Sequence, residues 1–326
     1  MPEHQLPEEM SMHSKVNMRK YLIVGTEGTG GPIGAYLAKA GKDVTFIARG
    51  NNLKAIKENG LKVIRPKDEF TLYPVKAAEL ENYHDTPDVI FVCVKGYSVV
   101  PMIPELQRIA DKNTIIIPIL NIIGTGGMMQ KHFPDTLVTD GCVYVASELK
   151  EPGCIRMKGE ILRVIFGVRD RKDHRNELKK IEADLRESGI DGFLSDNIAN
   201  DALLKFSYVS PQGACGLYYN VASGEIQKDG EIRECFKGLI QEIDALANAM
   251  GIVFEEDIVE RNLNILDTLS PTMTTSMQRD IAAHKPSEID GLICEVIRLA
   301  EKYNVEVPIY KKIEKALRER GYIPGL

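Results

Sequence analysis

The chain has no long apolar run and no basic tract, and each absence excludes a class of partner. No apolar stretch approaches the roughly 18 residues that a membrane span needs. The formal net charge is −6, and Lys and Arg form no stretch of the kind that follows a phosphate backbone. We therefore expect neither a membrane nor a nucleic acid as a partner.

The six cysteines and six histidines also lack the spacing of metal ligands, so no metal site is expected. The cysteines form no C-x-x-C pair and mostly occupy apolar segments, which is typical of reduced core residues in a cytoplasmic protein. What the chain does have is 326 residues with 44% apolar content. That is enough for a substantial core and, by length, for two domains.

Near the N-terminus, the sequence has the order strand, glycine-rich turn, helix, strand. We predict the strands over Tyr21–Val24 and Asp43–Ala48, with the helix ending at Ala40. Glycine lets the chain leave the first strand tightly, and free N–H groups at the helix N-terminus suit a pyrophosphate. The turn therefore predicts a nucleotide site, and its expected cofactor-binding residues are Gly25, Thr26, Glu27, Gly28, Thr29 and Gly30.

Glu27 is the point at which this turn departs from the dinucleotide-binding fingerprint. In G-x-G-x-x-G counted from Gly25, it replaces the second glycine, where the phosphates pass closest. Like-charge repulsion there costs about 1 kcal/mol in water-like surroundings and more in a less polar site. Either the loop takes another path through Gly28 or binding is weak. A glycine-rich turn that binds nothing is the alternative.

Arg49 follows the second strand, at the position that distinguishes NAD from NADP sites. An NAD site has Asp or Glu there for the ribose hydroxyls, whereas a guanidinium suits a 2′-phosphate. We therefore expect NADP(H) as the cofactor. The alternative is a solvated arginine at the end of a strand.

Two further apolar segments of strand length end in polar residues. Asp88–Lys95 ends in Lys95, and Thr114–Leu120 is followed by Asn121. Open α/β sheets bind ligands at the carboxyl ends of their strands. Both residues are therefore expected at one crevice, with a solvated strand-end charge as the alternative for Lys95.

The character of the chain changes near residue 190. Before it we expect an α/β half, in which short strands over 136–168 are broken at Pro152-Gly153 and at Gly159. After it, apolar residues repeat at helical spacing. The predicted fold class is α/β plus all-α. The expected parts are a disordered leader (1–17), a Rossmann-like dinucleotide-binding domain (18–190) and a helical substrate and dimerisation domain (191–326). Before residue 190, the other expected helices cover 53–59 and 173–188 and the other expected strands 61–65 and 70–76.

The order of the motifs resembles the ketopantoate reductases (2-dehydropantoate 2-reductases) from about residue 18 to 320. The resemblance rests on GTEGTGGPIGAYLAKAG, VTFIARGNNLKAIKENGLKV, VCVKGY, LNIIG, ASELKEPG, Lys205, TSMQRDI and KPSEID, in that order. It implies reduction of a 2-keto acid by NADPH. It also implies a Rossmann-like domain followed by a helical domain, with the substrate between them.

The resemblance also implies roles for individual residues. Lys205 holds the place of the lysine that protonates the developing alkoxide, and Glu288 that of the glutamate near the reaction centre. Asn121 matches an asparagine near both nicotinamide and substrate. Lys95 matches a lysine on the cofactor side, and Ser276 a substrate-binding serine. Ser223 stands where a substrate-binding asparagine is expected.

Each of these residues also has a structural alternative. Lys205 lies among apolar neighbours, where a half-buried ammonium would be a better acid than a free lysine, but it could also snorkel from an amphipathic helix. Ser276 or its threonine neighbours could cap the following helix. Glu288 could be a favourable charge in a first helical turn.

Several positions differ from the family pattern. Asn-Gly is expected at 121–122 and again at 293–294, where this chain has Asn121-Ile122 and Ile293-Cys294. Two other substrate-binding asparagines are replaced by Val209 and Gly213. Losing amide donors should lower selectivity for a hydroxylated substrate.

The sequence as a whole therefore predicts an NADPH-dependent reductase of a small 2-keto acid, either ketopantoate or a less polar relative, with a homodimer as its assembly. The alternative is a nucleotide-binding or interaction protein that has lost turnover.

Overall fold

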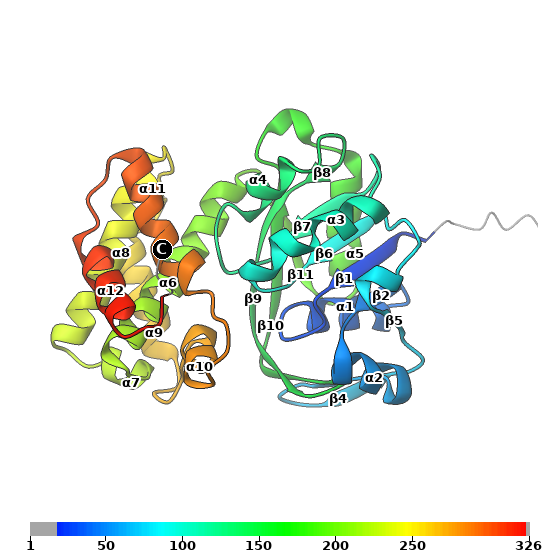
Figure 1. The fold of residues 1–326 in the computed structure, drawn as a ribbon, viewed down its shortest axis with the longest axis horizontal. Helices are drawn as coiled ribbons and strands as arrows, with labels where there is room; N and C mark the ends of the chain where they lie inside the picture. The colour runs from blue at the N-terminus through cyan, green and yellow to red at the C-terminus, as the bar shows by residue number, and fades with distance from the viewer. Residues whose placement is uncertain (1–17, 324–326) are drawn as a thin grey trace, which may run out of the picture.

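The computed structural model describes residues 18–323, which form a sheet domain followed by a helical domain (Figure 1). The sheet domain contains a parallel sheet flanked by helices, and the helical domain contains no strand within the described residues. This arrangement confirms the predicted fold class. The expected leader, residues 1–17, lies outside the described residues.

The first sheet is parallel, with strand order β5-β2-β1-β6-β7-β8. Its centre is β1 (Lys20–Val24), between β2 (Asp43–Ile47) and β6 (Val89–Val92). Because strands are added first on one side of β1 and then on the other, the switch point lies at the carboxyl ends of β1 and β6. The outer strands are β5 (Lys76–Ala78), β7 (Ile115–Pro118) and β8 (Leu137–Val138).

The second sheet has the order β11-β10-β3-β4, with β9 paired to β10. β9 (Asp140–Glu151) and β10 (Cys154–Gly167) form a long hairpin, so the prediction of short strands was wrong here. Gly159 does not end a strand, because a register shift between Met157 and Leu162 absorbs it as a bulge. The remaining strands are β3 (Leu61–Ile64), β4 (Glu69–Leu72) and β11 (Asp191–Leu194).

Helices cover the parallel sheet and follow the predicted segments closely. A tight turn precedes α1 (Gly30–Lys39), and Gly60, with φ +81°, ends α2 (Gly50–Asn59). The predicted strand over 70–76 is divided between the two sheets at Pro74, which cannot donate a ladder hydrogen bond. The other helices of this domain are α3 (Val99–Ile109), α4 (Thr125–Gln130), α5 (Asn176–Glu187) and the short 3₁₀ turns η1 (Leu80–Asn82), η2 (Gly96–Ser98) and η3 (Arg171–Asp173).

The helical domain begins with α6 (Ile198–Tyr219), which also packs on β9 and β10. Because β11 still pairs with β10, the change from strands to helices falls at 195–197 rather than at 190. A π-helical turn, η4 (Asp290–Cys294), leads into α11 (Glu295–Tyr303). The other helices are α7 (Ser223–Ile226), α8 (Glu231–Ala249), α9 (Ile258–Thr268), α10 (Ser276–Ala282) and α12 (Pro308–Glu319).

Among residues 18–323, none of the helices combines the length and apolar character that crossing a membrane requires.

Candidate active site

The glycine-rich turn is held at the carboxyl end of the parallel sheet. The N–H of Gly25 and the hydroxyl of Thr26 both donate to the carbonyl of Ile47, at 3.3 and 3.0 Å. Gly25 has φ +100°, and a Cβ there would lie 2.7 Å from the carbonyl oxygen of Cys93. Only glycine therefore fits where the turn passes between the ends of β2 and β6.

Glu27 is exposed, whereas Gly28 is packed against the β9–β10 hairpin. The hydroxyl of Ser147 donates to the carbonyl of Gly28, and a Cβ on Gly28 would lie 2.9 Å from the carbonyl oxygen of Ser147. The carbonyl of Glu27 accepts from the N–H of Gly31 at 2.9 Å, in the first turn of α1. Gly28 thus makes room for the hairpin. Thr29, which is half-buried, is the N-cap residue of α1.

Arg49 is exposed and stands between β2 and α2, two residues beyond the Ile47 carbonyl that holds the turn. Asn52, in the first turn of α2, donates to the carbonyl of Thr26 at 3.0 Å and accepts from the N–H of Gly153 at 2.8 Å. The turn, the hairpin and the start of α2 are therefore fixed to one another beside Arg49.

Lys95 and Asn121 are neighbours because of strand register. Val92 of β6 is paired with Pro118 of β7, and each polar residue follows three positions later. Both side chains are half-buried. The expectation that these two strand ends meet at one place therefore agrees with the pairing of the strands.

Lys205 lies on α6 and reaches back to the sheet domain. Its ammonium is buried, with 8% of the residue exposed, and donates to Oδ1 of Asn121 at 2.7 Å. Burial lowers the pKa of Lys205, and negative charge on Cys142 or Glu288 opposes that shift. Burial also raises the pKa of the Cys142 thiol to about 11, so this thiol is neutral at pH 7 and Glu288 supplies the opposing charge.

Glu288 makes its direct contacts with the loop after β6. Its carboxylate accepts from the N–H of Gly96 at 3.2 Å and from Nζ of Lys95 at 3.5 Å. Lys95 also donates to Asp280 of α10 at 2.9 Å. Burial lowers the pKa of Lys95, but the charges of Glu288 and Asp280 outweigh it, so the net shift is upward. Glu288 thus acts on Lys205 through its charge.

The two predicted serines are in different surroundings. Ser276 is half-buried at the first position of α10, but Thr275 caps that helix, in a capping box with Gln278. The Ser276 hydroxyl is therefore not needed for capping. Ser223 is buried, and its hydroxyl donates to the carbonyl of Met273 at 3.1 Å. The structure therefore places Ser223 in a polar group of the helical domain and does not join it to Lys205.

Ile122 occupies the position at which the family pattern has glycine. A Cβ added at Gly96 would lie 2.6 Å from its Cδ1, and one at Gly291 would lie 2.4 Å from its Cγ2. Ile122 also contacts apolar cores of both domains. It therefore packs between one glycine of the sheet domain and one of the helical domain.

We call Lys95, Asn121, Lys205, Asp280 and Glu288 the interdomain cluster. Asp280 was not predicted as a site residue, although it lies within TSMQRDI, one helical turn after Ser276. Its partner Lys95 is 185 residues away in sequence. The spacing to Ser276 is the feature of the sequence that could have identified it.

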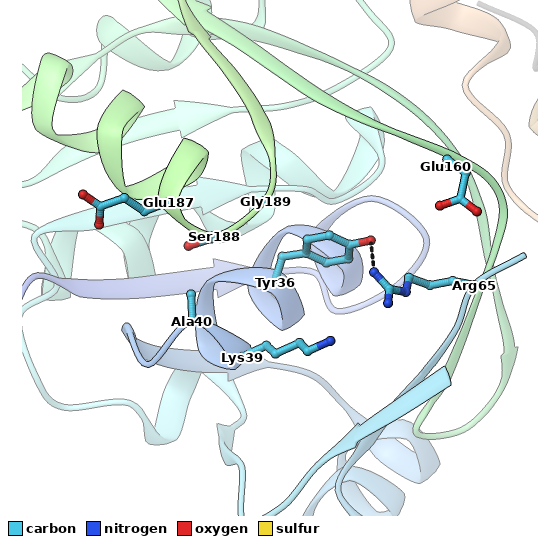
Figure 2. A pocket seen from close by; sticks show the side chains of 8 residues that line it. All are labelled: Tyr36, Lys39, Ala40, Arg65, Glu160, Glu187, Ser188 and Gly189. Carbon is cyan, nitrogen blue, oxygen red and sulfur yellow. Dashed lines mark hydrogen bonds between the residues drawn. The ribbon is translucent and has the colours of Figure 1, made fainter. Parts of the chain in front are cut away.

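A separate cavity of about 470 Å³ lies at the other end of α1, away from the glycine-rich turn (Figure 2). Figure 2 shows the guanidinium of Arg65 donating to the hydroxyl of Tyr36, at 3.3 Å. Cationic side chains and carboxylates both line this cavity, and none of the predicted site residues is among them. Its lining residues are Tyr36, Lys39, Ala40, Arg65, Glu160, Glu187, Ser188 and Gly189.

Comparison with known proteins agrees with this two-domain arrangement. Residues 21–171 match the family described as ketopantoate reductase PanE/ApbA, and residues 197–320 match its C-terminal family. The chain belongs to the ketopantoate reductase family, and its relatives are oxidoreductases.

The relatives and structural neighbours are similar over nearly their whole length. The chain is 25% identical to an uncharacterized oxidoreductase, YkpB, of Bacillus subtilis, over 90% of this chain and 96% of that protein. It is 25% identical to a 2-dehydropantoate 2-reductase of a Nostoc species, with coverages of 90% and 92%.

The solved structures that share this fold include a D-mandelate dehydrogenase and a ketopantoate reductase. A D-mandelate dehydrogenase with NADH and anilino(oxo)acetate has a TM-score of 0.83 at 22% identity, covering 92% of this chain and 98% of its own. A dimeric ketopantoate reductase of Staphylococcus aureus has a TM-score of 0.78 at 21% identity, with coverages of 92% and 98%.

Proposed function

We propose that the protein is an NADPH-dependent reductase of a small 2-keto acid. The observation that carries this proposal is the buried ammonium of Lys205, 2.7 Å from Asn121 at the carboxyl end of the parallel sheet. Burial makes Lys205 a better acid than a solvated lysine. Lys205 would protonate the substrate oxygen, and the chemistry that a bound nicotinamide cofactor would supply is the hydride for the keto carbon.

The chain has a group for each part of this cofactor. The turn from Gly25 to Gly30 and the N-terminus of α1 would hold the pyrophosphate. The exposed guanidinium of Arg49, beside that turn, suits a 2′-phosphate. Lys95 and Asn121, at the adjacent strand ends, would hold the nicotinamide side. Glu27 is the one residue here that opposes an anion.

The residues proposed to surround the keto group have separate roles in binding and in proton transfer. The amide oxygen of Asn121 holds the ammonium of Lys205 in place. The charge of Glu288 favours the protonated form of Lys205. Because Thr275 caps α10, the Ser276 hydroxyl can bind the polar groups of the substrate. Burial of Lys205 keeps water from competing for its proton.

The substrate that these residues favour is less polar than ketopantoate. Val209 is half-buried against the helical core. The methyl group of Met277 lies 2.8 Å from the position that a Cβ on Gly213 would take. Ile293 is fully buried. Apolar groups thus replace three expected polar ones. The structural neighbour D-mandelate dehydrogenase, solved with anilino(oxo)acetate, supports a substrate of this kind.

The decisive experiment is titration with NADPH and NADH, followed by cofactor oxidation with a panel of 2-keto acids that includes ketopantoate and phenyl- and alkyl-substituted acids. We expect tighter binding of NADPH and faster turnover of the apolar members. Failure to bind either cofactor would overturn the proposal. Binding without turnover of any acid would favour a protein that has kept the scaffold and lost the reaction.

We also propose a homodimer, since one structural neighbour, the Staphylococcus aureus reductase, is dimeric. Light scattering coupled to gel filtration tests this directly. A mass of 36.3 kDa at micromolar concentration would exclude it.

A further inference from the structure

Charges of opposite sign alternate through the interdomain cluster. Glu288 acts on Lys205 of α6 through its charge rather than through a hydrogen bond. Glu288 accepts from Lys95 at 3.5 Å, and Lys95 donates to Asp280 at 2.9 Å. The four side chains come from α6, the segment before η4, the loop after β6, and α10. Three segments of the helical domain and one loop of the sheet domain thus meet in a single row of charges.

The member of this row next to Lys205 is better shielded from water than the two beyond it. Of the three partners, the side chain of Glu288 is 5% exposed, that of Asp280 23% and that of Lys95 31%. Charge interactions act over longer distances where water is excluded. A change at Lys95 or Asp280 therefore reaches Lys205 mainly through Glu288.

We propose that Asp280 and Lys95 are positioning residues that together set the electrostatic field at Lys205, acting through Glu288. Asp280 holds the ammonium of Lys95 at 2.9 Å, which leaves Lys95 a longer contact, 3.5 Å, with Glu288. The carboxylate of Glu288 therefore keeps part of its charge for Lys205. This inference rests on the proposed function, in which Lys205 must be protonated to react.

The net charge of the three partners of Lys205 predicts the direction in which each variant shifts its titration. Glu288, Lys95 and Asp280 together carry one net negative charge. Asp280→Asn leaves the three neutral, and Lys95→Met leaves two negative charges. The double variant has one negative charge again, as in the native protein. A negative neighbour favours the ammonium form of Lys205, so the two single variants should shift its titration in opposite directions.

Other titratable groups near the row stay constant in this comparison. Cys142, on β9, faces Lys205 as a neutral thiol at pH 7. Tyr97, after Lys95, interacts with Lys95, Asp280, Glu288 and Glu27. Burial raises the pKa of Tyr97 above its ordinary value, so its phenol also stays neutral at pH 7. Neither group is altered in the variants.

The first measurement is the pH dependence of kcat/KM for reduction. Activity is lost on the alkaline side as Lys205 loses its proton. We expect the alkaline limb to move down by about one pH unit in Asp280→Asn and up by about one unit in Lys95→Met. The double variant should return to within a few tenths of a unit of the native limb, even if its kcat is lower.

A matched control is Asp290→Asn. Asp290 is two residues beyond Glu288, but its carboxylate is 73% exposed and paired with Arg298 at 2.9 Å. The control should leave the alkaline limb unchanged. Thermal unfolding of every variant confirms that each one folds.

The second measurement does not depend on turnover. Lysine labelled with ¹³C at Cε allows the titration of Lys205 to be followed by NMR in the cofactor-free protein, with Lys205→Arg identifying the resonance. The same opposite shifts are expected there. If no 2-keto acid is reduced, the proposed function fails and this titration still tests the row of charges.

Shifts of the same sign in the two single variants, or a double variant that equals the worse of them, would overturn the inference. Either result would mean that Lys95 and Asp280 only hold the loop in place. If the pH profile of kcat/KM is the same in all variants, Lys95 and Asp280 do not contribute to the electrostatic field at Lys205.

Discussion

Lys205 differs from a surface lysine because its ammonium is buried and its hydrogen bond goes to a neutral amide. The pKa of Lys205 is lowered, first by burial, so the protonated form is lost below the ordinary lysine value of 10.5. The reduction needs that protonated form. We therefore expect kcat/KM to fall as pH rises through the lowered pKa, measured with saturating cofactor.

Removing the acid by mutation should lower turnover at every pH. Lys205→Ala should lower kcat by about a hundredfold or more, because general-acid transfer contributes that much. Lys205→Arg is the control: it keeps the positive charge, yet its guanidinium does not give up a proton at these pH values. Near-native turnover in either variant would remove Lys205 from the mechanism.

Glu27 provides a test of the cofactor site. Because its carboxylate is exposed beside the turn, Glu27→Gly should tighten NADPH binding by about fivefold, corresponding to about 1 kcal/mol of relieved repulsion. Glu27→Gln separates charge from size and should give most of the gain. Fluorescence titration at low salt measures both variants, and unchanged affinity would place the phosphates elsewhere.

The proximity of Lys95 and Asn121 could be predicted from sequence, because two apolar strands of a parallel sheet end just before them. Lys205 required the family resemblance, since a lysine on an apolar helix has no local feature that distinguishes an acid from a snorkelling side chain. Asp280 could not be assigned a partner. Its ion pair with Lys95 joins two domains, and no periodic pattern encodes such a contact. The roles of these residues remain predictions.

At the scale of elements, segments with strong apolar patterns were predictable and those governed by contacts were not. β1, β6 and β7 are wholly or largely buried, and their apolar runs identified them. β11 has the sequence DGFL and lacks such a run. Gly192 within it is needed because a Cβ would lie 2.6 Å from Leu185 of α5. This packing against α5 determines that the segment forms a strand, and the sequence of the segment does not reveal it.

Asp184 joins α5 to β1 and to the turn before β2, and we expect Asp184→Asn to destabilise the fold by about 2 kcal/mol at pH 7. Its carboxylate accepts from Tyr21 at 2.5 Å, from Lys42 at 2.6 Å and from Arg19. Burial raises the pKa of Asp184, but these partners outweigh it and lower the pKa overall. The stabilisation is therefore present above the unfolded-state pKa and is lost as pH falls through the folded one.

Urea unfolding at pH 7 and at about pH 3 measures this dependence, and the difference between Asp184→Asn and the native protein should shrink in acid. Glu187→Gln is the control, because Glu187 pairs with the same Lys42 but its side chain is 65% exposed. It should cost only a few tenths of a kcal/mol. A loss in Asp184→Asn that is equal at both pH values would contradict the ionic explanation.

At the scale of the whole molecule, two kinds of contact join the domains. The polar ones include Lys205 to Asn121 and Lys95 to Glu288 and Asp280. The apolar ones include the packing of α6 on β9 and β10, where Ile198 lies against Cys142 and Ile165. They also include Ile122, packed between Gly96 and Gly291. The loss of glycine at 122 is therefore matched by glycines on both sides of it. The same adjustment is found at Gly213, which makes room for Met277.

Gly291→Ala tests whether Ile122 sets the approach of the two domains. A Cβ there would lie 2.4 Å from Cγ2 of Ile122, so the domains must separate or the side chain must move, at a cost of about 1–3 kcal/mol. Because Lys205 and Asn121 come from different domains, kcat/KM should fall together with stability. Ile122→Ala in the same chain removes the clash and should restore most of both.

Gly159→Ala is the control, since a Cβ at that position meets nothing within 4 Å. The four combinations of residues at 122 and 291 form a double-mutant cycle, which isolates the coupling between them from the effect of either change alone. A coupling near zero would mean that the contact is incidental. A favourable coupling of about 1 kcal/mol or more, present in both unfolding and kcat/KM, would mean that one apolar side chain fixes the distance across which the proton is delivered.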